Sequence, residues 1–267
     1  MQINSELPIE LLCYNNEYNE YDFVLFHLME HSVYKNYFIN QRILHPDRLM
    51  ILDNSAYEYF IKGEQLDIQK FIEVINVLKP DYYILPDKLM DKEKTIEMVK
   101  SFDQSMCPYS SPIAIAQGNS ENDLIDCLNI YKNMNIKYIG LPFHNSFFRD
   151  KSVYYDIQYI FYNKYKVITE DIRYAMGRVQ FVQDNKELLD QFEKVHFLGS
   201  HCPLEKTFYN RYFSMDTGYP VKLGILNISL FNETEKPNII IDDFMFEPLN
   251  EIQKCVILNN INKFKYI

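Results

Sequence analysis

Short apolar segments alternate with longer amphipathic segments along this chain, and that alternation constrains the fold more than any other feature. Seven segments have the run of apolar residues expected of a buried strand, at residues 22–28, 49–53, 82–87, 112–117, 137–141, 196–200 and 213–216. Apolar residues recur at intervals of three and four, as in amphipathic helices, over residues 67–79, 92–102, 121–134 and 185–195. This order predicts an α/β fold with parallel strands.

The positions of polar residues distinguish between two parallel-sheet architectures. Strands that are apolar throughout are buried on both faces, which fits a barrel or a doubly wound sheet. Here polar residues and glycines gather at or near the strand ends, at His27, Asp53, Asp87, Gln117, Gly140, Gly199 and Asp216. In a barrel those ends meet at one face, where catalytic residues come from several strands. We therefore predict a (β/α)8 TIM-like barrel.

The chain shows no internal boundary. Its 267 residues match the size of one barrel, and no repeat or Gly/Ser-rich linker divides it, so we predict a single domain over residues 1–267. Residues 144–178, rich in Tyr and Phe, are the hardest to assign and suggest an insertion or lid, or else a packed aromatic subcore with a charged outer face. A helical pattern over residues 247–264 is expected to close the barrel.

Composition limits the classes of partner. The net charge of −10 argues against broad binding to a phosphate backbone, although it leaves room for a local basic groove. The five cysteines form no CxxC pair and the histidines form no HxH or HExxH motif, so we expect neither disulfides, metal nor other cofactor. No export signal or apolar stretch of about 18 residues is present, which predicts a cytoplasmic protein without a membrane partner.

The acidic residues at strand ends allow two interpretations. Asp53 and Asp87 suit the N-cap of a following helix, and Asp216 precedes a turn-prone Thr-Gly pair. The amide of Gln117 needs a hydrogen-bond partner, which is either backbone or a ligand. Carboxylates that share a pocket can instead have different pKa values, so that one is a nucleophile and another transfers protons. A carboxylate also accepts from adjacent N–H donors, such as those on the edge of guanine.

Several motifs, in order, resemble the tRNA-guanine transglycosylases. DNSAY (53–57) resembles the family's D-S-G-G-Y/F, and HFLGSHCPLE (196–205) resembles its L-x-G-x-x-x-P-x-[DE]. DTGYP (216–220) resembles the D-x-x-x-P turn that holds the nucleophile. Three further matches lie between these, at PDYYILPD (80–87), IAIAQG (113–118) and YIGL (138–141).

The resemblance implies a barrel enzyme with defined site residues. Asp216 would attack the sugar C1′ and expel guanine, and Asp53 would be the general acid/base. Asp87 would bind the guanine edge, while Tyr57 would stack on the ring. The remaining substrate-binding positions implied by the motifs are Gln117, Gly118, Gly140, Leu141, Gly199 and Lys222.

Departures from the family pattern change the expected substrate. The tRNA enzymes carry a Cys-rich zinc motif with a following His after the nucleophile, whereas here only Cys255 follows and no His does. Ser55-Ala56 replaces a Gly-Gly pair and Lys222 replaces an arginine. The chain is more similar to the short, often phage-borne DNA relatives. This resemblance implies exchange of guanine in DNA, rather than tRNA, for a 7-deazaguanine derivative, with the target base unstacked. A lid formed by residues 144–178 is then expected to hold the strand by stacking and by its cations, Lys151, Lys164, Lys166, Arg173 and Arg178.

Three alternatives stay open. One is an enzyme of the same superfamily that acts on a free nucleoside or nucleotide or only hydrolyses the glycosidic bond. Another is a non-catalytic binding subunit, against which the retention of Asp53 and Asp216 speaks. The third is an unrelated barrel enzyme that uses paired acids on sugars. The oligomeric state is open.

Overall fold

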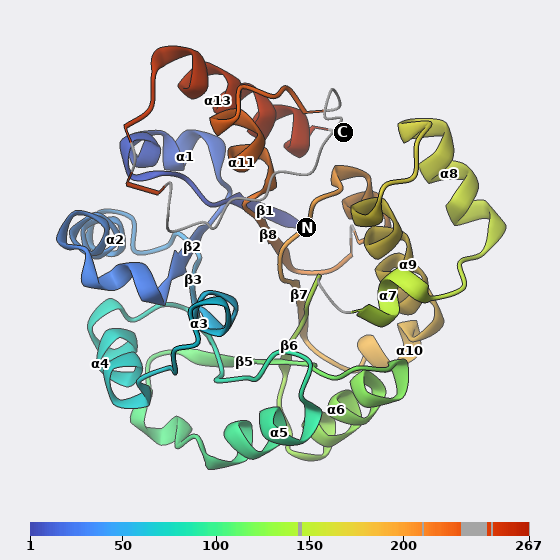
Figure 1. Cartoon of the computed structure of the whole chain (residues 1–267). Coiled ribbons are helices and arrows are strands. Elements are labelled where there is room, and N and C mark those ends of the chain that lie inside the picture. The colour runs from blue at the N-terminus through green and yellow to red at the C-terminus, as the bar shows by residue number, and fades with distance from the viewer. Residues whose placement is uncertain (144–145, 210, 231–244, 247, 267) are drawn as a thin grey trace.

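Eight parallel strands form one nearly closed barrel, so the predicted TIM-like α/β fold is confirmed (Figure 1). The computed structural model describes residues 1–143, 146–209, 211–230, 245–246 and 248–266. The hydrogen-bonded order is β1-β8-β7-β6-β5-β4-β3-β2. The strands are β1 (Gln2–Ser5), β2 (Asp22–Leu25), β3 (Met50–Asp53), β4 (Tyr82–Ile84), β5 (Ser111–Ile115), β6 (Tyr138–Leu141), β7 (Lys194–Phe197) and β8 (Ser214–Thr217).

Side chains bridge the seam where β1 and β2 stand at the two ends of this order. The Asn19 amide pairs with the backbone of Ser5, accepting from its N–H at 2.7 Å and donating to its carbonyl at 2.8 Å. The Asn4 side chain donates to the carbonyl of Tyr21 at 2.7 Å. These bonds satisfy backbone groups that an open sheet edge would expose.

Helices surround the barrel on its outside (Figure 1). The longer ones are α2 (Ser32–Leu44), α4 (Ile68–Leu78), α5 (Lys92–Ser101), α6 (Glu121–Asn133), α8 (Tyr155–Tyr165), α9 (Glu170–Asp184) and α13 (Glu251–Lys265). The shorter ones are α1 (Asn15–Tyr18), α3 (Ala56–Lys62), α7 (Ser146–Asp150), α10 (Lys186–Leu189) and α11 (Tyr219–Ile225). Four 3₁₀ helices complete the description, at Ile9–Tyr14, Phe26–Glu30, Gln104–Met106 and Pro203–Phe208.

All seven predicted strands are present, but the prediction missed β1. Its sequence, QINS, is short and half polar, so it lacks an apolar run. The helix predicted over residues 185–195 is wrong, since only α10 forms there. The helix ends at Leu189, and by Glu193 the chain already pairs with the neighbouring strand, since Glu193 N–H donates to the carbonyl of Lys137 at 2.9 Å next to the pairing of β7 with β6.

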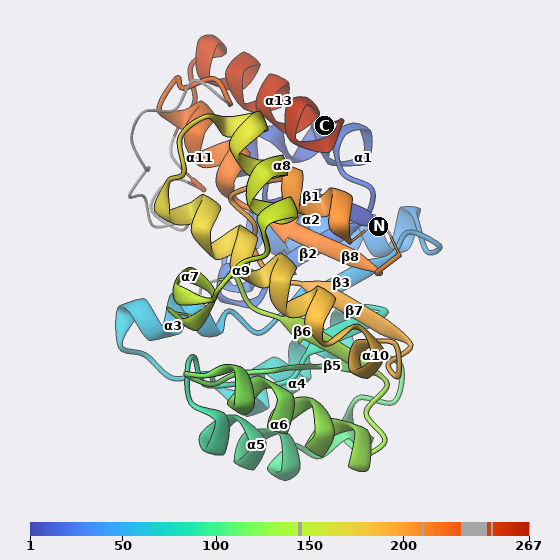
Figure 2. The same cartoon turned by 90° about the vertical axis from the view of Figure 1, so that its right-hand side faces the viewer.

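The described part of the 144–178 segment folds into α7, α8 and the first half of α9. Its phenylalanines and its tyrosines separate: Phe148 and Phe161 are buried, whereas Tyr155 and Tyr159 are exposed. At Gly177 a Cβ atom would lie 1.8 Å from the carbonyl oxygen of Phe148, so glycine lets α7 pack directly on α9. Figure 2 shows α7 on the same side of the barrel as α3, away from the N-terminus. His144 and Asn145 lie outside the described residues.

Within the described residues, none of the helices combines the length and apolar character needed to cross a membrane.

Candidate active site

A cavity of about 450 Å³ opens at the carboxyl ends of the strands. This is the face where TIM barrels place their active sites. Its walls are apolar at Phe23, Ile84 and Ile115, but acidic residues are the commonest polar residues that line it. Five acidic side chains from separate parts of the barrel line it, namely Glu6, Asp53, Glu58, Asp87 and Asp216. All five are buried.

Asp216 lies on β8, and its carboxylate is held from the neighbouring strand β7. The backbone N–H of Gly199 donates to both carboxylate oxygens at 3.1 Å, and His196 Nε2 lies 3.1 Å from Oδ1. The turn that follows is stabilised by Thr217 instead, whose Oγ1 accepts from the N–H of Tyr219 at 3.1 Å. Asp216 therefore faces the cavity in a fixed orientation and does not cap its own turn.

His196 is not among the site residues that the sequence predicts. The structure places it within β7, with Nδ1 2.9 Å from Ser214 Oγ and its ring stacked on Phe23 at a centroid distance of 5.5 Å. These contacts orient Nε2 toward Asp216. The signal that could have revealed this is its position one residue before the end of β7, in a strand whose alternate side chains point toward the barrel interior.

Asp53 ends β3, where its Oδ2 accepts from the N–H of Ser55 at 2.7 Å. Ser55 adopts a left-handed conformation with φ of 60°, and its hydroxyl lies 2.9 Å from Nδ1 of His27. The local hydrogen bond resembles the predicted capping role, but the side chain also lines the cavity. Burial raises the pKa of Asp53 well above its ordinary value, and the nearby charges of Glu58 and Asp216 raise it further.

Asp87 follows β4 and is gripped by two amides. Asn54 Nδ2 donates to Oδ1 and Gln117 Nε2 donates to Oδ2, each at 2.7 Å. The N-cap of the next helix, α5, is Asp91, so Asp87 is not the cap. Burial raises the pKa of Asp87, and the two amides offset part of that rise. A carboxylate has about four acceptor sites, so this one can still accept two N–H groups from a ligand.

Glu6 is a cavity residue that the sequence prediction missed. It directly follows β1, where Asn4 is in register with Asp216 on β8. Its Oε2 is buried and has no hydrogen-bond partner among the described residues. Burial raises the pKa of Glu6 well above its ordinary value, the charges of Asp216 and Glu58 add to the rise, and Lys222 opposes it. Glu58, on α3, was likewise missed.

The other predicted substrate-binding residues fall into two groups. Tyr57 on α3, Gly199 after β7 and Lys222 on α11 line the cavity, as Gln117 does. Gly140 and Leu141 lie within β6, where the carbonyl of Gly140 accepts from Ala116 N–H at 3.0 Å. The cavity wall beyond β6 is formed by Pro142 and Phe143.

Gly118 has a packing role. A Cβ atom there would lie 2.2 Å from Cβ of Asp123, the residue that forms a capping box with Ser120 at the start of α6. Gly118 is therefore fixed by the close approach of α6.

Arg178 supports the loop after β7 from within the core. Its guanidinium forms a bidentate pair with Glu205 at 2.5 and 2.9 Å and donates to the carbonyls of Leu198 and Gly199 at 2.9 Å. Ser200 and Tyr209 donate their hydroxyls to the Glu205 carboxylate. Arg178 is fully buried, so its predicted place among surface cations that hold a nucleic-acid strand is wrong.

Within the described ranges, no three His, Cys, Asp or Glu side chains are arranged to hold a metal ion. The chemistry available from the cavity is that of carboxylic acids with raised pKa values beside one carboxylate held by N–H donors.

Comparison with known proteins adds no family assignment. No protein-family model matches the chain, and no curated protein matches it significantly.

Proposed function

We propose that this protein is a transglycosylase that replaces guanine in DNA with a 7-deazaguanine derivative through a covalent aspartyl-glycosyl intermediate. One observation carries the proposal. Asp53, Asp87 and Asp216, the three acids singled out by the motif resemblance, come from three different strands and line one cavity. Separate strands must deliver these groups to a single reaction centre if they act together.

Asp216 is the proposed nucleophile. Its carboxylate attacks C1′, the bond from C1′ to N9 breaks, and the electron pair leaves with guanine. The N–H of Gly199 and the ring of His196 hold the carboxylate during the attack. The product of this half-reaction is a sugar esterified to Asp216.

Asp53 is the proposed general acid and base. Because its pKa is raised, it is available in the neutral form to give a proton to the departing guanine. The resulting carboxylate then takes the N9 proton of the incoming base, whose N9 attacks C1′ and releases Asp216. The enzyme returns to its starting protonation state.

Asp87 is the proposed recognition group. Asn54 and Gln117 fix its plane, so its free acceptor sites match the N1–H and N2–H donors of guanine. Tyr57, at the rim on α3, is available to cover the base.

The test measures base exchange directly. Radiolabelled guanine is incubated with the protein and with single-stranded DNA, duplex DNA or tRNA, and label retained in polymer is counted. We expect label in DNA, and loss of incorporation in Asp216→Asn but not in Asp47→Asn, whose carboxylate is exposed outside the cavity. Incorporation that persists in Asp216→Asn would exclude the proposed nucleophile.

A second function, cleavage of a free nucleoside, is favoured by the charge of the cavity. Five acidic side chains line the cavity, and Lys222 is the one lysine or arginine among its lining residues, which disfavours phosphate close to the reacting sugar. Under this function, guanine is released from guanosine or deoxyguanosine and no label enters any polymer.

A further inference from the structure

Helix α8 presents one packed face and one exposed aromatic face. Ile157 and Phe161 are buried, and the ring of Phe161 stacks on Phe208 at a centroid distance of 5.8 Å. Opposite them, Tyr155, Tyr159 and Tyr162 follow the i, i+4, i+7 spacing that aligns side chains along a helix. Their exposed fractions are 79%, 56% and 57%. Large aromatic side chains gathered on a surface in this way mark a binding site.

The three tyrosines line a second cavity of about 480 Å³, here called the tyrosine cavity. Its other lining residues include three cations, Arg149, Lys151 and Arg173, together with Gln158. The volume falls within the range of about 300–1,000 Å³ typical of ligand pockets. The ring centroids of Tyr155 and Tyr159 lie 6.1 Å apart, and the ring planes are 30° from parallel, so the two aromatic faces have similar orientations.

The three cations differ in availability. Arg149 pairs with Asp150 at 2.9 Å, and Lys151 pairs with Glu121 and Asp184 at 2.8 and 2.9 Å. Arg173 is exposed and forms no salt bridge with any residue that the structure describes. It is therefore the cation of the tyrosine cavity that no described carboxylate holds in a salt bridge, although its charge helps to lower the pKa of nearby Asp150.

The first half of α9 separates the tyrosine cavity from the candidate active site. Asp171 lies 3.1 Å from His201, and the ring of Tyr174 lies 5.9 Å from that of Phe143, so both contact residues of the active-site wall. Arg173, between them in sequence, lines the tyrosine cavity. The two cavities therefore lie on either side of the same turn of α9.

We propose that the tyrosine cavity binds the nucleotides of single-stranded DNA that neighbour the target base. Bases stack on Tyr155 and Tyr159, and Arg173 binds a phosphate. Aromatic faces accept any base, and a cation beside them is the combination used for sequence-independent single-strand binding. This inference rests on the proposed action on DNA. It also places the cationic contact outside the acidic catalytic cavity, where phosphate is repelled.

The experiment measures binding without chemistry. A fluorescein-labelled oligothymidylate, which contains no guanine to react, is titrated with the full-length protein and followed by anisotropy. Stacking on each ring is worth about fivefold or more in Kd, so Tyr155→Ala with Tyr159→Ala should weaken binding by about 25-fold or more. The matching double substitution to Phe keeps the rings and should bind as the parent does.

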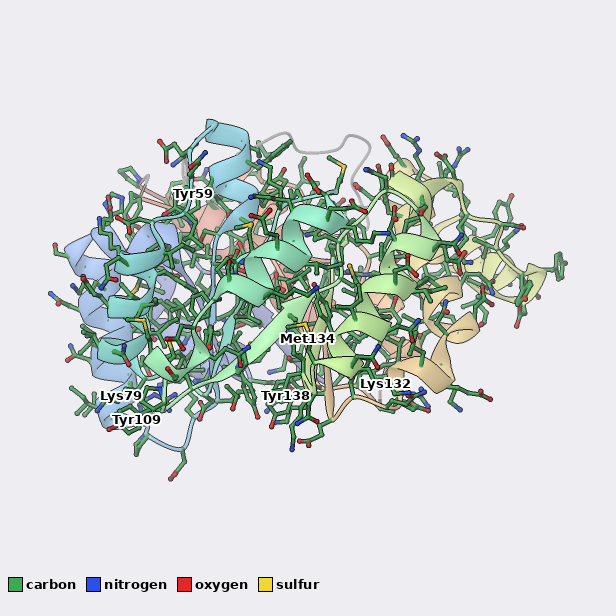
Figure 3. All side chains as sticks on the ribbon, turned by 90° about the horizontal axis from the view of Figure 1, so that it is seen from below. Tyr59, Lys79, Tyr109, Lys132, Met134 and Tyr138 are labelled. Carbon is green, nitrogen blue, oxygen red and sulfur yellow. The ribbon has the colours of Figure 1, made fainter. Side chains whose placement is uncertain are left out.

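Tyr109→Ala is the matched control. Tyr109 is 71% exposed and also lies beside a cation, Lys79, whose Nζ is 5.0 Å from the ring centroid. Figure 3 shows this pair on the opposite side of the molecule from α8. The control should leave binding unchanged.

The phosphate contact has its own readout. Arg173→Gln should reduce the slope of log Kobs against log salt concentration by about 0.7, the value for one phosphate on a single strand. An unchanged slope would show that Arg173 does not bind phosphate.

Three results separate this inference from the proposed function. Binding of oligothymidylate by the alanine double variant within twofold of the parent overturns the tyrosine cavity as a DNA site, even if guanine exchange is intact. Loss of that binding in a protein without base exchange supports the cavity and rejects the exchange. A parent that binds no oligothymidylate but dimerises through these tyrosines, as judged by sedimentation, makes this face a protein interface and also overturns the inference.

Discussion

The backbone N–H of Gly199 points at Asp216 and donates to both of its carboxylate oxygens at 3.1 Å. This geometry depends on the left-handed conformation of Gly199, whose φ is 57°. Arg178 binds the carbonyl of the same residue at 2.9 Å, so the peptide on either side of Gly199 is fixed by one buried guanidinium and one carboxylate. The proposed catalysis by Asp216 should therefore depend on the backbone of Gly199, which has no side chain to contribute.

Gly199→Ala tests this dependence. A left-handed alanine is disfavoured by about 1–2 kcal/mol, and relaxation of the backbone turns the N–H away from Asp216. We expect guanine exchange to fall about tenfold or more, the effect of losing one hydrogen bond to a charged group. The measurement is kcat for label incorporation into DNA.

Gly63→Ala is the control for Gly199→Ala. Gly63 has φ of 67° and free space around the added methyl group, so its substitution carries the same backbone penalty far from Asp216. The two variants should lose similar free energy of unfolding, and only Gly199→Ala should lose exchange. Equal rates in the two variants would remove the N–H of Gly199 from the mechanism.

Glu6→Gln should stabilise the protein at neutral pH. The pKa of Glu6 is raised in the folded state, so folding becomes less favourable as the pH rises through the range between its ordinary and its raised value. Glutamine lacks that charge. We expect a higher Tm than the parent at pH 7 and a much smaller gain at pH 4, where the parent side chain is mostly neutral in both states. For a chain of this size each kcal/mol corresponds to about 2–4 °C.

Glu10→Gln, in the same segment, should change the Tm at pH 7 in the opposite direction. The hydrogen bond from Lys254 lowers the pKa of Glu10, so its ionised form contributes stability above its ordinary pKa. The variant should lose a small amount of Tm at pH 7. A gain in Glu10→Gln equal to that in Glu6→Gln would point to net charge, not to burial of Glu6.

Sequence patterns predicted the barrel and three of the five acidic residues that line its candidate active site. Seven of the eight strands are marked by apolar runs, and Asp53, Asp87 and Asp216 stand at or just after the ends of three of them. Because the strand ends of a barrel converge, the sequence predicted that these three residues share one face. The residues found are those whose position along the strand defines their direction.

The residues missed depend on contacts between distant segments. β1 is stabilised by Asn19 and by pairing with β8, neither of which its own four residues predict, and Glu6 was lost with it. Glu58 comes shortly after β3, but its position is that of an ordinary acidic residue in the first turn of a helix, here α3. From the sequence, Arg178 was expected to be a surface cation. It is buried because Glu205, 27 residues later, pairs with it inside the core.

Asp87→Asn should change base selection more than the chemical step. The substituted amide presents one acceptor and one donor, so it cannot accept from both N1–H and N2–H of guanine. We expect KM for guanine to rise about 10–100-fold, with a smaller change in kcat. Labelled hypoxanthine, which lacks the 2-amino group, should compete better in the variant than in the parent. If guanine retains its full advantage over hypoxanthine in Asp87→Asn, another group reads that edge.

Because the Arg178–Glu205 pair is buried, removal of one partner should strongly lower the stability of the protein. Both side chains are fully buried, so Glu205→Gln leaves an uncompensated guanidinium and should lower the free energy of unfolding by about 3–5 kcal/mol. The joint replacement Arg178→Met with Glu205→Leu removes both charges and should be less destabilising than Glu205→Gln. The exposed pair Lys137–Glu193 is the control, and Glu193→Gln should lower stability much less than Glu205→Gln does, because solvent screens an exposed pair. Urea unfolding of the four proteins measures these differences.

The joint variant also distinguishes an effect on stability from an effect on the geometry of the site. If it folds but exchanges guanine slowly, the guanidinium acts on Asp216 through the carbonyl of Gly199. If it folds and exchanges at the parent rate, the pair serves the core alone.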